Sequence, residues 1–296
     1  MNQYPADSAG QPPAQPSPGP VRLSLPTSVP YVTYTIVAIT GLVYLLQLGS
    51  VAMFGYANAA SQMDWLEAYG ARINELLRAG EVWRFLTPVL LHASVPHILF
   101  NMYALIVFGA GLERNFGHAR FLVLYLLGGF TGNVLSFLLS SGYSVGASTA
   151  IFGLVGAEGI FLVQNRGLFG AQFGRAIGNV LFIVAVNLFL GLTPGIDNWG
   201  HVGGLLGGLV FTWFAGPVWE VRQGASFSGT MPALYLADRR EAREVLTGAA
   251  TVILIFGALA AWGMMLDMTK VAKLISRLAA RSLWGQRWPR SKPLPE

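Results

Sequence analysis

The chain has no cysteine among its 296 residues, which excludes disulfide bonds, thiol catalysis and cysteine-ligated metals. Charged residues are also scarce, at 11% against about 25% in soluble globular domains. The four histidines leave little room for a histidine-built metal site, so we expect neither a metal nor another cofactor. With 53% hydrophobic residues in long apolar runs, the chain is predicted to be an integral membrane protein.

Long apolar segments predict the fold class, because a helix needs about 20 apolar residues to cross the hydrocarbon core. We expect an all-α, polytopic membrane bundle. The middle segments are rich in glycine and hold polar residues, which is typical of helices packed inside a bundle. The seven candidate spans are Tyr31–Phe54, His97–Leu112, Phe121–Leu139, Ser148–Val163, Ile177–Gly191, His201–Phe214 and Val245–Met265.

Composition divides the chain into five parts. Residues 1–30 hold half of the 16 prolines and have no basic start or apolar stretch, so we expect a disordered cytoplasmic tail rather than a signal peptide. Residues 31–218 form the main helical core, with short interfacial helices expected within 55–91. A polar linker (219–244) and the seventh helix (245–266) follow. The basic tail (267–296) has the pattern of an amphipathic helix on an anionic membrane, with a solvated charged tail as the alternative.

The distribution of basic residues predicts the orientation. With the N-terminus in the cytoplasm, nine arginines lie in cytoplasmic segments, whereas only Arg72, Arg78 and Arg84 precede the tail on the other side. Seven spans would place the basic tail outside, against this rule, but downstream charges carry less weight. We expect a bacterial plasma (inner) membrane, with lipids rather than nucleic acid as the partner of the basic tail.

Ser148 begins the fourth candidate span, within Gly146-Ala147-Ser148. Backbone N–H groups in the first turn of a helix have no intrahelical acceptor and favour negative charge, which suits a serine nucleophile and its oxyanion. Taken alone, the serine fits a helix cap or a small packing residue better than a nucleophile.

His201 begins the sixth span and shares a helical face with Gly204 and Gly208. Bare glycines let a second helix approach closely, within reach of the imidazole. Burial disfavours the charged imidazolium, so the ring could accept a proton from a serine. A structural hydrogen bond in a helix interface is the alternative.

His97 and Asn101 lie on one face of the second span, four residues apart. Both side chains can donate hydrogen bonds to a developing oxyanion, although a structural polar pair would look the same. We assign structural roles to Trp83, Arg84 and Glu113, which flank this span, and expect Asp197 to cap the sixth helix.

Together these residues supply a nucleophile, a base and oxyanion donors at one depth of the membrane, as acyl transfer requires. No acidic residue is well placed as a third member, so a Ser–His dyad is the simpler interpretation. The motifs, in this order, resemble the rhomboid family of intramembrane serine proteases: Trp83-Arg84, His92 with His97-Ile98-Leu99-Phe100-Asn101, Gly146-Ala147-Ser148 continued by Ile151-Phe152-Gly153, and His201-Val202-Gly203-Gly204 with Gly208.

The resemblance implies a six-helix rhomboid protease core with Ser148 as nucleophile and His201 as base and acid. It also implies an oxyanion hole from His97, Asn101 and the Ser148 N–H, and a seventh helix as in one branch of the family. The expected substrates are transmembrane proteins, cut near the outer end of a span. Phe152 stands where some members have a tyrosine that packs on the histidine.

Two other functions remain open. The first is a catalytically weak or inactive rhomboid-like protein that binds transmembrane clients. Its only support is Thr149, which follows the serine where many rhomboids have glycine; such proteins usually lose the serine or the histidine, and both are present here. A transporter or channel would instead use the histidines and Asp197 as a proton path. That class predicts polar residues through the depth of the membrane, whereas here they cluster at one end.

Overall fold

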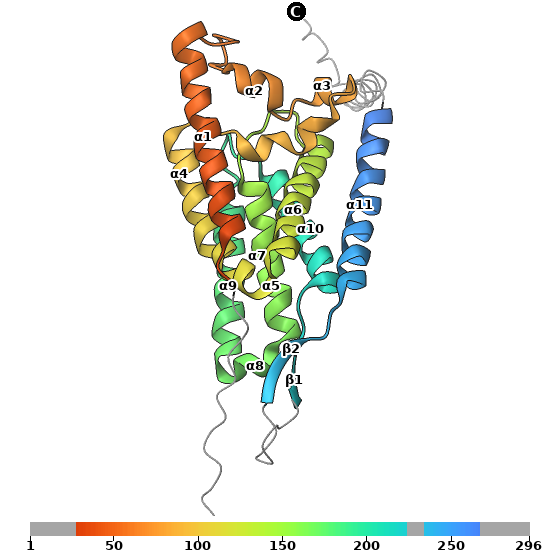
Figure 1. Cartoon of the computed structure of the whole chain (residues 1–296). Coiled ribbons are helices and arrows are strands. Elements are labelled where there is room, and N and C mark those ends of the chain that lie inside the picture. The colour runs from red at the N-terminus through yellow and green to blue at the C-terminus, as the bar shows by residue number, and fades with distance from the viewer. Residues whose placement is uncertain (1–27, 224–233, 267–296) are drawn as a thin grey trace, which may run out of the picture.

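A computed structural model describes residues 28–223 and 234–266 of the chain. Seven long helical segments dominate it (Figure 1). They are α1 (Tyr31–Phe54), α4 (Val95–Ala104) continued by a π-helical turn (Leu105–Gly109) and α5 (Ala110–Phe116), α6 (His118–Leu139), α7 (Ser148–Gln164), α9 (Phe173–Leu190), α10 (Asn198–Ala215) and α11 (Ala242–Met265).

The fold is an all-α, polytopic membrane bundle. By length and composition, five helical segments of the described chain could cross a membrane: Tyr31–Phe54, Val95–Phe116, His118–Leu139, Arg166–Leu190 and Ala242–Met265. The apolar helix α7 is shorter, and α10 is not among the five. Both lie inside the bundle, where α10 packs against α6 and α7. Most of α7 and the glycine-rich face of α10 are buried by protein, so glycine and polar residues are tolerated there.

Short elements close the two ends of the bundle in Figure 1. At one end, the segment between α1 and α4 forms α2 (Trp65–Gly70), α3 (Asn74–Arg78) and two 3-10 turns (Val82–Phe85 and Thr87–Leu90). At the other end lie α8 (Arg166–Phe169), a 3-10 turn (Gly170–Gln172) and a hairpin of β1 (Trp219–Gln223) and β2 (Leu234–Asp238).

The predicted polar linker, residues 219–244, contains both strands of this hairpin and the start of α11. Its strands pair antiparallel, with Trp219 opposite Asp238. Asp238 accepts hydrogen bonds from the Val218 and Arg240 amides and forms a 2.8 Å ion pair with Arg120 at the start of α6. Residues 219–223 and 234–240 are therefore held against the bundle. The predicted tails 1–30 and 267–296 lie outside the described residues, apart from 28–30.

Candidate active site

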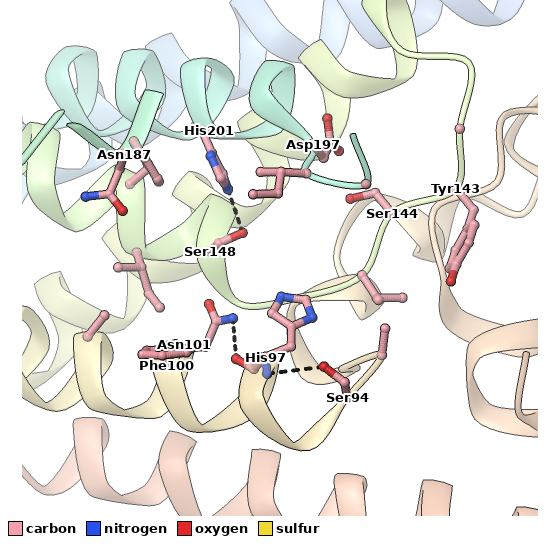
Figure 2. Close-up of a pocket in the computed structure, with 18 of the residues that line it drawn as sticks. Ser94, His97, Phe100, Asn101, Tyr143, Ser144, Ser148, Asn187, Asp197 and His201 are labelled. Atoms are coloured by element: carbon pink, nitrogen blue, oxygen red, sulfur yellow. Dashed lines mark hydrogen bonds between the residues drawn. The ribbon is translucent and has the colours of Figure 1, made fainter. Parts of the chain in front are cut away.

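The starts of α7 and α10 each bring one reactive side chain to a shared cavity (Figure 2). Ser148 is the first residue of α7, and His201 lies in the first turn of α10. The Ser148 Oγ and the His201 Nε2 are 3.0 Å apart, which is a hydrogen-bond distance. The imidazole can accept the hydroxyl proton in the tautomer that leaves Nε2 unprotonated.

Glycines on α10 make this approach possible. A Cβ added at Gly204 would overlap the backbone carbonyl of Thr149, and one added at Gly208 would overlap that of Gly153. Thr149 and Gly153 both lie on α7. The glycine face of α10 is therefore the face that meets the helix that begins at Ser148.

The His201 ring is held by stacking rather than by an acid. It lies parallel to the Phe152 ring, with centroids 4.2 Å apart and planes 9° apart. The buried His201 Nδ1 has no hydrogen-bond partner among residues 28–223 and 234–266. Asp197 instead caps α10, because its Oδ1 accepts a 3.1 Å hydrogen bond from the Gly200 amide. The predicted capping role of Asp197 is confirmed.

His97 and Asn101 face Ser148 from α4 across the same cavity, whose volume is about 770 Å³ (Figure 2). The Asn101 Nδ2 donates to the His97 carbonyl at 2.9 Å, and its second N–H is a further donor. The loop before Ser148 passes close to the His97 ring, because a Cβ added at Gly146 would come within 2.7 Å of its Nε2. The cavity therefore brings imidazole and amide donors near the serine hydroxyl.

His92 fixes the backbone just before Ser148. Its Nε2 accepts a hydrogen bond from the Ala147 amide at 3.4 Å, and the residue is 1% exposed. Burial, with a smaller contribution from neighbouring His97, lowers the pKa of His92 to about 3. The ring is therefore neutral at physiological pH and able to accept this bond.

Trp83 and Arg84 lie away from the cavity and tie the first loop to itself. The Arg84 guanidinium is buried, donates to the Ala71 and Ala68 carbonyls at 2.7 and 2.8 Å, and pairs with Glu81 at 2.6 Å. The Trp83 indole donates to the Tyr69 carbonyl at 3.1 Å. These contacts stabilise the conformation of the first loop.

Glu113 lies on α5, also outside the cavity lining. Its fully buried carboxylate accepts from the Val32 and Thr33 amides at 2.9 and 2.7 Å, and from the Thr33 hydroxyl at 2.7 Å. His118 approaches the same carboxylate at 2.6 Å. Glu113 thus anchors the start of α1 to the end of the second span.

Gln47 and Arg72 belong to the surroundings of the site, and the sequence analysis did not identify them. The Gln47 side chain in α1 donates to Asp64 at 2.7 Å and to the His92 carbonyl at 3.3 Å, and accepts from the His92 amide at 3.1 Å. A polar side chain inside an apolar span could have signalled Gln47. Arg72 entered the sequence analysis only as one of the basic residues that predict the orientation, and no pattern in the neighbouring residues predicts its burial.

The polar groups lining the cavity are hydroxyls, imidazoles, amides and the Asp197 carboxylate. Within the described ranges, no group of three or more His, Cys, Asp or Glu side chains is arranged to hold a metal ion. The set matches the needs of acyl transfer by a serine.

Comparison with known proteins identifies the family. The Rhomboid domain family matches residues 79–218. Rhomboid protease GluP of Bacillus subtilis (strain 168) is 39% identical over 181 residues, covering 60% of this chain and 34% of the relative. Two Arabidopsis thaliana proteins are also similar: RHOMBOID-like protein 9, chloroplastic (35% over 159 residues, 53% and 37% covered), and RHOMBOID-like protein 6, mitochondrial (40% over 147 residues, 49% and 45% covered). The chain spans less than half the length of each of these relatives. Residues 79–218 contain Ser148, His201, His97 and Asn101, and this part of the chain is a rhomboid domain.

Proposed function

We propose that this rhomboid protein is an active intramembrane serine endopeptidase with Ser148 as nucleophile and His201 as general base and acid. The observation that carries the proposal is the 3.0 Å distance between the Ser148 Oγ and the His201 Nε2 in a polar cavity. The name of the relative GluP, a rhomboid protease, supports the same reaction class. Transmembrane proteins are the proposed substrates.

In the first step, His201 Nε2 takes the hydroxyl proton as the Ser148 oxygen attacks the substrate carbonyl carbon. The carbonyl oxygen becomes an oxyanion, and the Ser148 N–H, His97 and Asn101 are its proposed donors. The C–N bond then breaks as His201 returns the proton to the leaving amine, which leaves an acyl-enzyme. Water, deprotonated by His201, attacks the ester carbonyl, and the proton returns to Ser148 as the carboxylic product leaves.

The position of Ser148 at the helix start strengthens this arrangement. The first N–H groups of α7 have no acceptor within the helix, and the helix dipole favours negative charge at that end. Phe152 stacking limits rotation of the His201 ring. Because the Nδ1 of His201 has no carboxylate partner within the described residues, the reaction uses a dyad.

The inactive, client-binding alternative rests on Thr149, and its placement weakens that alternative. The Thr149 side chain is 3% exposed and does not line the cavity. A Cβ added at Gly132 of α6 would come within 2.5 Å of the Thr149 Cβ, and one added at Gly200 of α10 within 3.0 Å of the Thr149 Cγ2. The β-branched side chain therefore fills a helix crevice, away from the space that an oxyanion would occupy.

We also propose a cytoplasmic N-terminus in a bacterial inner membrane, on the arginine distribution described above. The activity is tested with a fluorogenic transmembrane peptide in liposomes, comparing the purified protein with Ser148→Ala and His201→Ala. Cleavage by the wild type that both substitutions abolish supports the proposal. Cleavage that survives Ser148→Ala would refute the assignment of the nucleophile.

A further inference from the structure

Arg72 is a first-loop residue whose side chain is 0% exposed. A buried guanidinium costs several kcal/mol unless it is paired and hydrogen-bonded. Arg72 lies between α2 and α3, donates through Nη1 to the Asn74 side chain and through Nη2 to the Gly142 carbonyl, and has Asp197 Oδ2 at 3.9 Å from Nη2. Its partners thus belong to three different segments of the chain.

One of those segments carries the proposed base. Asp197 precedes α10, accepts from the Gly200 amide through Oδ1, and accepts through its carbonyl from the His201 amide at 3.2 Å. Its Oδ2 also accepts from the Ser136 hydroxyl on α6. The carboxylate that starts the His201 helix is therefore the charge partner of Arg72.

A second segment carries the proposed nucleophile. The Arg72 amide donates to the Ser144 carbonyl at 3.0 Å, and the Ser144 amide donates to the Arg72 carbonyl at 3.1 Å. Ser144 lies four residues before Ser148, and Figure 2 shows Ser144 and Asp197 flanking the cavity. Neighbouring Asn74 adds a 2.8 Å bond to the Ser140 carbonyl at the start of the same loop.

We infer that Arg72 and Asp197 are positioning residues that set the spacing between the Ser148 loop and the His201 helix. Arg72 is hydrogen-bonded to the loop before Ser148 and forms a 3.9 Å ion pair with Asp197 before the His201 helix, although it touches neither reacting side chain. The inference rests on the proposed function, because it concerns the geometry of the Ser148–His201 pair. A displacement near 1 Å at reacting atoms can cost about 10²-fold in rate, so loss of either partner should lower kcat more than it alters KM.

The test compares Arg72→Met and Asp197→Asn with Arg78→Met as the matched control. Arg78 is on α3 and lies over the Phe137 ring at 4.8 Å, with no ion pair to either loop among the described residues. Asparagine still caps a helix and has nearly the same volume. Asp197→Asn therefore keeps an acceptor for the Gly200 amide while it removes the charge and the second acceptor oxygen, and it serves even if Arg72→Met fails to fold. Hydrogen exchange of residues 140–147 and 194–201 and the kinetics of peptide cleavage are measured on each protein.

We expect Arg72→Met to speed hydrogen exchange in residues 140–147 and in residues 194–201, although Arg72 lies in neither segment. Asp197→Asn should speed exchange in residues 140–147 as well as in residues 194–201, where Asp197 lies. The kcat of each variant should fall by about 10- to 100-fold, and its KM should change by about threefold or less. The double variant should have a kcat no lower than that of the less active single variant. Arg78→Met should match the wild type in both measurements.

Exchange confined to the segment of each substitution, or a kcat within about threefold of the wild type in both variants, would overturn the inference while leaving the proposed protease activity intact. If the wild type itself fails to cleave, the proposed function falls instead. The exchange data then still decide whether Arg72 couples the two loops.

Discussion

Gly146 offers a sharp test of how closely the loop before Ser148 packs against His97. Its φ is +124°, a conformation that side-chain-bearing residues rarely adopt, and an alanine Cβ would lie 2.7 Å from the His97 Nε2. Ordinary contact begins at 3.4 Å. The His97 ring or the loop must therefore shift by roughly 0.7 Å, in addition to the backbone strain.

Gly146→Ala should lower stability by about 1–3 kcal/mol through the strained backbone. It should lower kcat by about 10- to 100-fold, because the shift moves either the serine or a proposed oxyanion donor. Thermal unfolding in detergent and cleavage of a transmembrane peptide measure the two effects separately.

Gly142→Ala is the matched control from the same loop. Gly142 has nothing within 4 Å of an added Cβ, and its carbonyl, which accepts from Arg72, is unchanged by the substitution. It should behave like the wild type. A Gly146→Ala protein with wild-type kcat would refute the close approach of the loop to His97 as a requirement for activity.

Three further changes have defined outcomes. Phe152→Leu should lower kcat about fivefold by removing stacking worth about 1 kcal/mol, whereas Phe152→Tyr should retain activity. Equal kcat values for the two variants in steady-state kinetics would contradict the role of the aromatic ring. Burial, then the nearby Asp64 charge, raises the pKa of Glu67 to about 7, so the folded state holds the proton more tightly than the unfolded state. The contribution of Glu67 to folding stability is complete below about pH 4.5 and is lost as pH rises through about 7. The Tm of the wild type minus that of Glu67→Gln should therefore fall between pH 5.5 and pH 8. A difference in Tm that does not change with pH would contradict the raised pKa of Glu67. Glu113→Ala should destabilise the fold by about 3 kcal/mol, because it strands buried donors of Thr33; an unchanged Tm would show that the anchor is dispensable.

Apolar run length predicted the membrane bundle well, because a bilayer leaves the backbone few alternatives to helices. Each of the seven predicted spans falls on a helix. The helices extend beyond the apolar runs where polar caps begin them: α11 starts at Ala242, three residues before the predicted span, because Glu241 and Glu244 form a capping box. The hairpin was missed because the sequence around its strands is polar and has no long apolar run.

Motif spacing brought attention to Ser148, His201, His97 and Asn101, since each motif is local and the resemblance gives their order. The supporting bonds are different in kind. The Gln47 side chain meets His92 across 45 positions, and Arg72 meets Gly142 across 70. Spacing within a helix or loop carries no information about such pairs, and only the packed bundle reveals them.

Covalent labelling by a serine-reactive phosphonate, followed by peptide mapping with mass spectrometry, tests the central claim most directly. The account predicts one adduct on the wild-type protein, at Ser148 and not at Ser144, which lines the same cavity. It also predicts that His201→Ala abolishes the adduct, because the hydroxyl then lacks its base. Labelling at another serine, or labelling of Ser148 that persists without His201, would contradict the dyad.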